Sequence, residues 1–380
     1  MTMKHYNILL VRDRSAFSTK WVCDFASNLV KSGQKVTLLC DTTKQKKDII
    51  INPKVVKTNL SAKTNNILLN LWKSFCLHFT LPNFRFSRAI KKIKPDIIIC
   101  YFLQDLFRVA FLQKHNVPII LMMHNPPNEV FEKQFKHWWK RLIFKHLIKK
   151  VSVIQVLMPE FIEMVKNEFP DKKVALIPNQ VEIPEESKDY SHETSTIIHV
   201  AQIAQAKHQR DLIEAFIPLA KDFPEWKIKF FGKVKNSKKH IKYMQQLQKL
   251  VKNNNLEQQV IFSGFSYNIT AEYLNSEIVA FPSYTEGFGY GLADGLALGL
   301  PGIGYDFALA VNHILVNEKS GYLVADKAEM TEKMRILMSD RELRKKMGKF
   351  ARHDMERYSP NIIISQWLEL IENILMDKTK

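Results

Sequence analysis

Two acidic residues stand beside a glycine-rich loop in the second half of the chain. The stretch 281–304 reads FPSYTEGFGYGLADGLALGLPGIG and carries Glu286 and Asp294 eight positions apart. A buried strand is expected over 278–283, and an apolar helix follows the glycines at once. Such a helix start directs backbone N–H groups and the positive end of the helix dipole toward anions, most often phosphates. Carboxylates accept hydrogen bonds from hydroxyls. The stretch therefore predicts a ligand with phosphates and hydroxyls, and a nucleotide sugar has both.

The same arrangement also has a purely structural interpretation. A glycine loop between a strand and a helix is a common connection in α/β proteins, whatever they bind. The stretch 281–304 taken alone leaves both interpretations open. The elements and motifs around it have to decide between them.

Apolar strands alternate with amphipathic helices along most of the chain. In the first half we expect a helix over 17–32 and strands at 6–11, 36–40, 95–100, 118–123 and 151–156. In the second half we expect strands at 196–201, 226–231 and 260–265, and helices within 209–221, 238–254, 329–355 and 361–376. Continuous apolar strands between helices predict parallel sheets covered on both faces. The fold class is therefore α/β, with two Rossmann-like domains and a cleft between them, and function is expected at the carboxyl ends of the strands.

The chain length agrees with two domains. At 380 residues the chain exceeds the roughly 250 to 300 residues at which a single core stops growing. Near Pro178 the alternating pattern gives way to polar residues and prolines, which indicates a linker. We expect a first domain at 1–180, a linker at 181–195, a second domain at 196–358 and a C-terminal helix within 359–380.

Composition limits the classes of protein further. Hydrophobic residues make up 46% and charged residues 25%, which are globular values. No apolar run reaches the roughly eighteen residues of a membrane span, and the first residues lack the features of a signal peptide. The four scattered cysteines, Cys23, Cys40, Cys76 and Cys100, favour buried reduced thiols over disulfides or a zinc site. A cytoplasmic location is expected.

The net charge of +18 calls for an anionic partner or surface. Residues 131–150 read FEKQFKHWWKRLIFKHLIKK, in which aromatic and aliphatic residues alternate with lysines at helical spacing. A basic amphipathic helix with tryptophans suits the inner face of the cell membrane, and 66–88 would extend that surface. The alternative is a helix whose apolar stripe packs on its own sheet below a solvated basic face. Nucleic acid is not expected, since no nucleic-acid-binding module is visible.

The motifs as a group resemble the retaining glycosyltransferases of the GT-B fold, specifically glycosyltransferase family 4 of bacterial lipopolysaccharide, capsule and exopolysaccharide assembly. The family pattern P-S-x-x-E-G-F-G-x-x-x-x-E-A-x-A-x-G-x-P is met by 282–289 and then by Asp294, Ala297, Gly299 and Pro301. A later Gly321-Tyr322-Leu323-Val324 is similar to the family's G-x-L-V. The resemblance covers most of the chain, and it implies that the C-terminal helix returns to the first domain.

The resemblance assigns roles to individual residues. Glu286 would lie near the transferred sugar, Asp294 would bind the nucleotide ribose, and Lys207 would bind the donor diphosphate. His124, after an apolar strand, would help hold the sugar. Further donor contacts are expected from Gln202, Phe265, Gly287, Phe288 and Gly289.

Several positions depart from the family pattern. Asp294 is one methylene shorter than the usual Glu, and neutral Gln202 stands where the family has Arg. The missing cation would weaken stabilisation of the leaving group unless another one replaces it, and Lys233, Lys235 and Arg210 are the candidates. The N-terminal glycine pair of the family is replaced near Ala16 and Phe17, His313 replaces a usual Glu, and Gln180 replaces a usual Gly.

The implied activity is retaining transfer of a hexose from a nucleotide sugar, UDP-linked rather than GDP-linked, to a glycan or glycolipid acceptor. No metal or other cofactor is expected, because a D-x-D type pair is absent and Lys207 supplies positive charge. Two alternatives stay open. One is a hydrolase or epimerase of nucleotide sugars with the same fold, and the other is a non-catalytic subunit that binds a nucleotide sugar.

Overall fold

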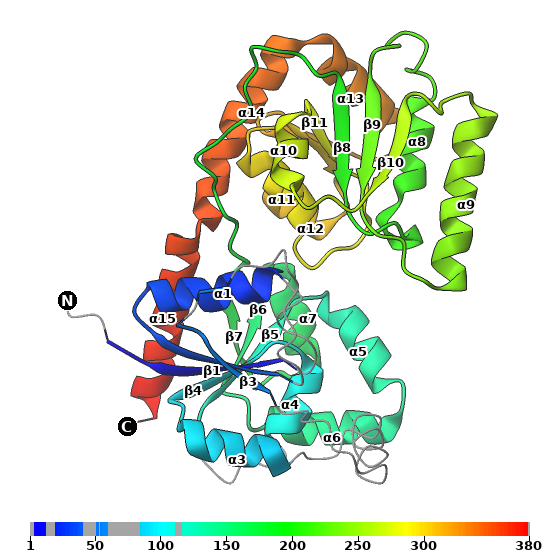
Figure 1. The fold of residues 1–380 in the computed structure, drawn as a ribbon. Helices are drawn as coiled ribbons and strands as arrows, with labels where there is room; N and C mark the ends of the chain where they lie inside the picture. The colour runs from blue at the N-terminus through cyan, green and yellow to red at the C-terminus, as the bar shows by residue number, and fades with distance from the viewer. Residues whose placement is uncertain are drawn as a thin grey trace. The chain divides into compact units, whose positions relative to one another are not determined.

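The computed structural model describes residues 4–12, 20–40, 51–52, 54–59, 84–110 and 116–378. The chain divides into two compact units (Figure 1). Unit 1 comprises Met1–Gln180 and Pro360–Lys380, and unit 2 comprises Val181–Ser359. Each unit is built on its own parallel sheet, so the expected α/β fold class with two Rossmann-like domains is confirmed.

The sheet of unit 1 has seven described strands in the order β3-β2-β1-β4-β5-β6-β7. Its strands are β1 (Asn7–Arg12), β2 (Lys35–Cys40), β3 (Val56–Asn59), β4 (Ile97–Cys100), β5 (Ile119–Met123), β6 (Val153–Val156) and β7 (Lys173–Leu176). All pairs are parallel, and every residue of β4 and β5 is buried. Strands covered on both faces select the continuous Ile, Leu and Met runs seen in the sequence.

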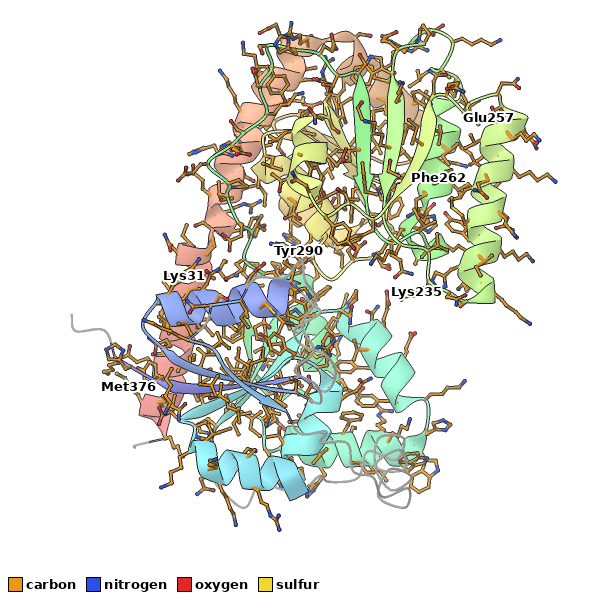
Figure 2. The ribbon with its side chains drawn as sticks, viewed as in Figure 1. Lys31, Lys235, Glu257, Phe262, Tyr290 and Met376 are labelled. Atoms are coloured by element: carbon orange, nitrogen blue, oxygen red, sulfur yellow. The ribbon has the colours of Figure 1, made fainter. Side chains whose placement is uncertain are left out.

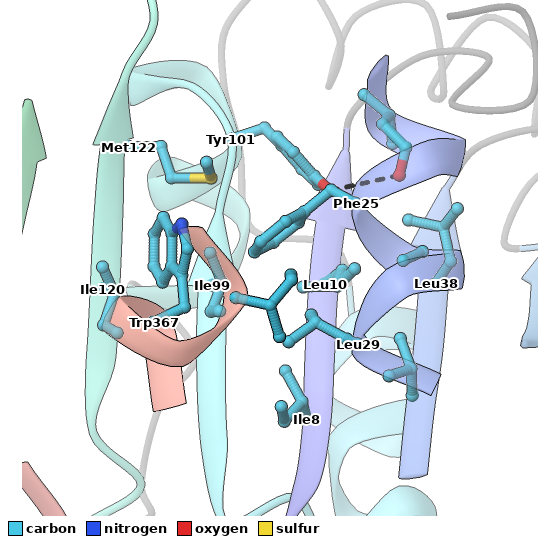
Figure 3. Packing of buried hydrophobic residues seen from close by; sticks show 14 of the residues in the cluster. Ile8, Leu10, Phe25, Leu29, Leu38, Ile99, Tyr101, Ile120, Met122 and Trp367 are labelled. Carbon is cyan, nitrogen blue, oxygen red and sulfur yellow. Dashed lines mark hydrogen bonds between the residues drawn. The ribbon is translucent and has the colours of Figure 1, made fainter. Parts of the chain in front are cut away.

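The helices of unit 1 come from both ends of the chain. They are α1 (Lys20–Lys31), α3 (Phe84–Ile93), α4 (Leu103–Ala110), α5 (Pro127–Phe135), α6 (Trp138–Ile148), α7 (Glu160–Glu168) and the C-terminal α15 (Pro360–Asp377). Trp367 of α15 is 1% exposed and packs in one core with Phe25 of α1 and Ile120 of β5 (Figure 3). The C-terminal helix thus completes the core of unit 1.

Unit 2 holds a six-stranded parallel sheet in the order β10-β9-β8-β11-β12-β13. Its strands are β8 (Thr196–Val200), β9 (Lys227–Phe231), β10 (Val260–Gly264), β11 (Ile278–Phe281), β12 (Gly302–Tyr305) and β13 (Gly321–Val324). Its α-helices are α8 (Gln209–Phe216), α9 (Lys238–Asn253), α10 (Ile269–Leu274), α11 (Tyr290–Ala297), α12 (Leu309–Ile314), α13 (Lys327–Ser339) and α14 (Arg341–Met355), with short 3-10 helices η2 (Gln205–Lys207) and η3 (Glu356–Tyr358).

The segment expected as a linker, 181–195, is part of unit 2. Lys188 and Glu277 form a buried ion pair at 2.9 Å, with both side chains 1% exposed. Glu277 also accepts from the guanidinium of Arg344 at 3.3 Å, and the Tyr190 hydroxyl donates to the carbonyl of Gly299 at 2.7 Å. Buried charges are stable only when paired, so these contacts fix the segment on its unit.

The expectation of one basic helix over 131–150 is wrong. The chain forms α5 and α6 instead, with a break at Lys136 and His137. Phe131, Phe135 and Phe144 pack against one another within unit 1.

The expected helix over 17–32 begins at Lys20 in the described residues. Of the stretch 66–88, only 84–88, at the start of α3, is described.

The structure also bears on the expectations about the cysteines and about membrane-spanning helices. Cys23, Cys40 and Cys100 are buried free thiols, while Cys76 lies outside the described residues. In the part of the chain that the structure describes, no helix combines the length and apolar character needed to span a bilayer.

Candidate functional site

The glycine loop follows β11 and ends at the first turn of α11. Gly289 has φ 90° and ψ 47°, a left-handed conformation that glycine adopts without a steric cost. This turn lets the chain pass from the buried strand directly into the helix, so the start of α11 lies at the carboxyl edge of the sheet, where Figure 2 labels Tyr290. The side chain of Phe288 is 3% exposed and packs on Tyr290 and Tyr358. Any ligand contact of Phe288 would therefore use its backbone.

Close approach of two backbones places α11 against the end of β8. A Cβ atom on Gly291 would lie 2.0 Å from the carbonyl oxygen of Val200, which leaves no room for a side chain. Gly232 approaches Ala201 in the same way, at 1.8 Å. The loops that follow β8, β9 and β11 are consequently neighbours at one edge of the sheet.

Lys207 and Glu286, predicted to bind the donor diphosphate and the sugar, are brought together. The ammonium of Lys207, in η2 after β8, donates a hydrogen bond to Oε1 of Glu286, in the loop after β11. The Lys207 side chain is 25% exposed and the Glu286 side chain 13%. An ion pair that is half-buried but still open to solvent can exchange partners with a charged ligand.

Asp294 lies in α11, one turn inside the helix. Its charge contributes to raising the pKa of Tyr273, for which burial is the larger cause. The Tyr273 hydroxyl donates to the carbonyl of Gly291 at 2.7 Å. Asp294 therefore lies near enough to Tyr273 of α10 for its charge to act on the phenol.

A buried histidine supports the loop that carries Gln202 and Lys207. His199 is 0% exposed, and its Nδ1 lies 2.9 Å from the carbonyl oxygen of Ala280. The amide nitrogen of Gln209 lies 3.3 Å from His199 Nε2 and donates to the backbone carbonyl of Gln202 at 3.0 Å. Burial lowers the pKa of His199 to about 4, so the imidazole is neutral. Nδ1–H then donates to Ala280 and Nε2 accepts from Gln209.

The three candidate replacements for the missing cation differ in their contacts and exposure. Arg210 pairs with Glu214 at 2.6 Å on the surface of α8. Lys233 lies with its ammonium 4.0 Å from the ring centre of Phe265, which is 42% exposed. Because the backbone carbonyl of Lys233 accepts from Ile203 N–H at 3.3 Å, Lys233 is adjacent in space to the Gln202 loop. Lys235 is exposed in the turn into α9 (Figure 2).

A ring cluster beside the ion pair was not predicted. The rings of His208 and Tyr284 stack with centroids 3.4 Å apart, and the Tyr284 hydroxyl donates to Asp211 at 3.0 Å. His208 directly follows Lys207 and Tyr284 lies two residues before Glu286, and this proximity to predicted site residues was the available signal. The contacts of Asp211 depend on tertiary structure and leave no pattern in the sequence.

His124 belongs to unit 1, at the carboxyl end of β5. Its ring lies 4.2 Å from that of Trp21 and 5.8 Å from that of Tyr101, centre to centre. Burial, and secondarily the charge of Arg12, lower the pKa of His124 to about 3. Its Nε2 is buried without a hydrogen-bond partner among the described residues. A neutral imidazole with a spare nitrogen suits hydrogen bonding to a hydroxyl. Ala16 and Phe17 lie outside the described residues.

Two Rossmann-like units, each built on its own parallel sheet, agree with the GT-B fold that the sequence motifs imply. Residues 19–183 match the family model Glycosyltransferase Family 4, and residues 181–354 match the model Glycosyl transferases group 1. Together the two models cover most of the chain. The chain therefore belongs to the glycosyltransferases that these models describe.

Solved structures agree on the fold. The chain is similar to sucrose-phosphate synthase from Thermosynechococcus elongatus, with a TM-score of 0.78 at 15% identity over 97% of this chain and 99% of that one. It is also similar to HepE from Anabaena, solved in complex with UDP and glucose, with a TM-score of 0.74 at 14% identity over 97% and 100%. At these identities the likeness establishes the GT-B fold alone.

Among curated proteins, the exopolysaccharide phosphotransferase of Streptomyces coelicolor is 28% identical over 207 residues. That match covers 53% of this chain and 21% of the relative. Across the curated relatives that it matches, the chain spans between 21% and 65% of their length.

Proposed function

We propose that this protein transfers a hexose from a UDP-linked sugar to a glycan or glycolipid acceptor, with retention of configuration, in the synthesis of a surface polysaccharide. The observation that carries the proposal is the Lys207–Glu286 pair at the glycine loop. The family membership supports glycosyl transfer, the UDP and glucose bound by HepE support the donor, and the exopolysaccharide relative supports the context.

The ion pair suits a ligand with a diphosphate next to a sugar. An ammonium group has three donors, and Glu286 engages one of them, which leaves two for phosphate oxygens. The second oxygen of Glu286 is then available to a sugar hydroxyl. With the start of α11, Lys207 would stabilise the charge that develops on the departing diphosphate.

We propose three further contacts to the donor. Asp294 would accept hydrogen bonds from the ribose hydroxyls. Lys233, beside the Gln202 loop, is the best placed of the three candidate cations to replace the missing Arg. His124, neutral and with an unpartnered nitrogen, would bind a sugar hydroxyl.

Retention needs no enzyme nucleophile if the acceptor attacks the same face that the diphosphate leaves. The donor phosphate oxygen then takes the acceptor's proton as the anomeric C–O bond breaks. Glu286 orients the sugar in this scheme. Its hydrogen bond to Lys207 keeps a carboxylate oxygen engaged, which disfavours a role as a covalent nucleophile. Metal-independent transfer is part of the proposal, because Lys207 and the helix start supply positive charge.

We propose that the protein binds the cytosolic face of a membrane, and the exposed side chains on α6 support contact with a lipid surface. Trp138 is 75% exposed, Leu142 59% and Trp139 38%, although their neighbours Phe144 and Leu147 are buried. Basic residues flank them, and tryptophan next to lysine is typical of interfacial helices. This exposed group of Trp138, Trp139 and Leu142 is called the α6 patch below.

The test is a Glu286→Gln variant assayed for release of UDP from UDP-hexoses with total lipid or truncated lipopolysaccharide as acceptor. We expect kcat to fall by about 100-fold, because a sugar that is no longer held in the reactive orientation reacts more slowly by that order. Glu214→Gln, which changes an acid paired on the surface of α8, is the matched control and should keep full activity. Unchanged transfer by Glu286→Gln, or no UDP binding in calorimetry, would overturn the proposal.

The same assay separates the alternatives. Steady release of free sugar without acceptor would indicate a hydrolase. Binding of UDP-hexose without turnover under any acceptor condition would indicate a binding subunit.

A further inference from the structure

The ring cluster joins the two loops that carry the ion pair. His208 directly follows Lys207, and Tyr284 precedes Glu286 by two residues. The planes of the two rings differ by 5°. This contact ties the loop after β8 to the loop after β11, immediately beside the Lys207–Glu286 pair.

Asp211 fixes the second half of the cluster. The Tyr284 hydroxyl and the Tyr305 hydroxyl both donate to Asp211 Oδ2 at 3.0 Å. Asp211 is 8% exposed in the first turn of α8, where a negative charge also stabilises the helix. Burial raises the pKa of both tyrosines, so each keeps the proton that it donates. The carboxylate therefore holds the ends of β11 and β12 against α8.

His208 has a left-handed backbone conformation, which is unfavourable for histidine. Its φ is 48° and its ψ 35°, in the left-handed region that glycine enters without strain. Such strain persists where surrounding contacts impose it, and it concentrates at functional sites. A glycine at this position would fold more easily but would leave Tyr284 without its stacking partner. The ring, and not the backbone, explains why histidine stands here.

We infer that His208, Asp211 and Tyr284 are positioning residues that hold Lys207 and Glu286 in the mutual arrangement required by the diphosphate and sugar of the donor. They act through the two loops and do not need to touch the donor. The donor part of this inference rests on the proposed function. The loop-to-loop connection itself is a property of the free protein.

The test is His208→Gly, which removes the ring and suits the backbone. We expect the thermal stability of unit 2 to change little, because relief of the left-handed strain offsets the loss of the stack. Amide hydrogen exchange in 203–208 and in 283–289 should accelerate together, because the stack joins both loops. The Kd for UDP-hexose should rise by about tenfold, in keeping with the loss of one stacked pair at a positioning contact.

Asn255→Gly is the matched control. Asn255 has φ 55°, lies exposed at the end of α9, and takes no part in the ring cluster. It undergoes the same relief of left-handed strain without loss of a stacked ring. Its exchange in both loops and its Kd should match those of the wild type.

A second variant, Tyr284→Leu, should weaken donor binding to a similar degree, and combining it with His208→Gly should add little. Faster exchange confined to 203–208, or an unchanged Kd in His208→Gly, would overturn the inference. If the wild type binds no UDP-hexose, the proposed function fails instead, and exchange in the two loops alone decides on the connection.

Discussion

At the scale of single residues, protonation states decide what the two buried histidines contribute. His199 and His124 lie in different units, and burial lowers the pKa of each, to about 4 and about 3. His199 supports the Gln202–Lys207 loop through Gln209. The two histidines therefore link pH to stability in each unit.

The pH dependence of unit 2 has a defined sign. In the unfolded chain His199 would titrate near its ordinary pKa of about 6.5. The unfolded state binds more protons between that value and the folded pKa of about 4, so the contribution is complete above pH 6.5 and is lost as the pH falls toward 4. From pH 7 to pH 5 we expect a loss of about 2 kcal/mol in the free energy of unfolding.

Hydrogen exchange of the β8 and β11 amides at both pH values measures this loss, since it reports on the stability of the region that contains them. A His199→Gln variant lacks the titrating group. It should show a pH dependence smaller by that amount. An equal pH dependence in the variant would mean that His199 is already protonated at pH 5 in the folded protein.

At the scale of elements, α5 and α6 show how one apolar pattern serves two purposes. Phe131 and Phe135 of α5 and Phe144 of α6 pack inside unit 1. The α6 patch stays exposed, although its residues share the same helical spacing. Arg141 pairs with Glu168 through two hydrogen bonds of 3.0 Å, so part of the basic face is neutralised within the unit.

The α6 patch should govern binding to anionic vesicles. In a Trp138→Ala/Leu142→Ala double variant we expect affinity for phosphatidylglycerol vesicles to fall by about tenfold or more, because two large apolar side chains no longer enter the interface. Sedimentation with the vesicles measures the change. Tyr267→Ala, at a position 81% exposed in unit 2, is the control. Equal binding by the double variant would place the membrane contact elsewhere.

At the scale of the whole molecule, the chain builds a discontinuous first unit. Its last helix, α15, returns to the core formed by residues near the N-terminus, and Trp367 fills a space next to Phe25, with ring centres 5.2 Å apart. Unit 2 lies between these two segments in sequence. The stability of unit 1 therefore depends on both ends of the chain.

A Trp367→Ala variant should destabilise unit 1 by about 3 to 5 kcal/mol, the usual cost of emptying a large buried aromatic site. Hydrogen exchange of β1, β4 and β5 should show the loss, while exchange in β8 and β11 stays unchanged. Ile362→Ala on the same helix, at a side chain 42% exposed, should have little effect. A matching loss in unit 2 would show that the two units unfold together.

The sequence by itself determined the fold class and the core of the candidate site. Parallel strands buried on both faces require continuous apolar runs, and such runs are visible without a structure. The left-handed turn at Gly289 favours glycine and the close approach at Gly291 leaves no room for a side chain, so the glycines between Glu286 and Asp294 indicate this loop in the sequence. The prediction of one helix over 131–150 was wrong because helical periodicity does not reveal a break at Lys136 and His137.

Tertiary structure alone decided which side chains meet. The pairing of Lys207 with Glu286, the stack of His208 on Tyr284 and the pairing of Arg210 with Glu214 join positions whose proximity depends on the packing of strands and helices. Burial likewise separated Phe144 from Leu142, although both are apolar and lie on one helix. Contacts and desolvation are properties of the folded chain, and the local patterns that predict helices and strands do not contain them.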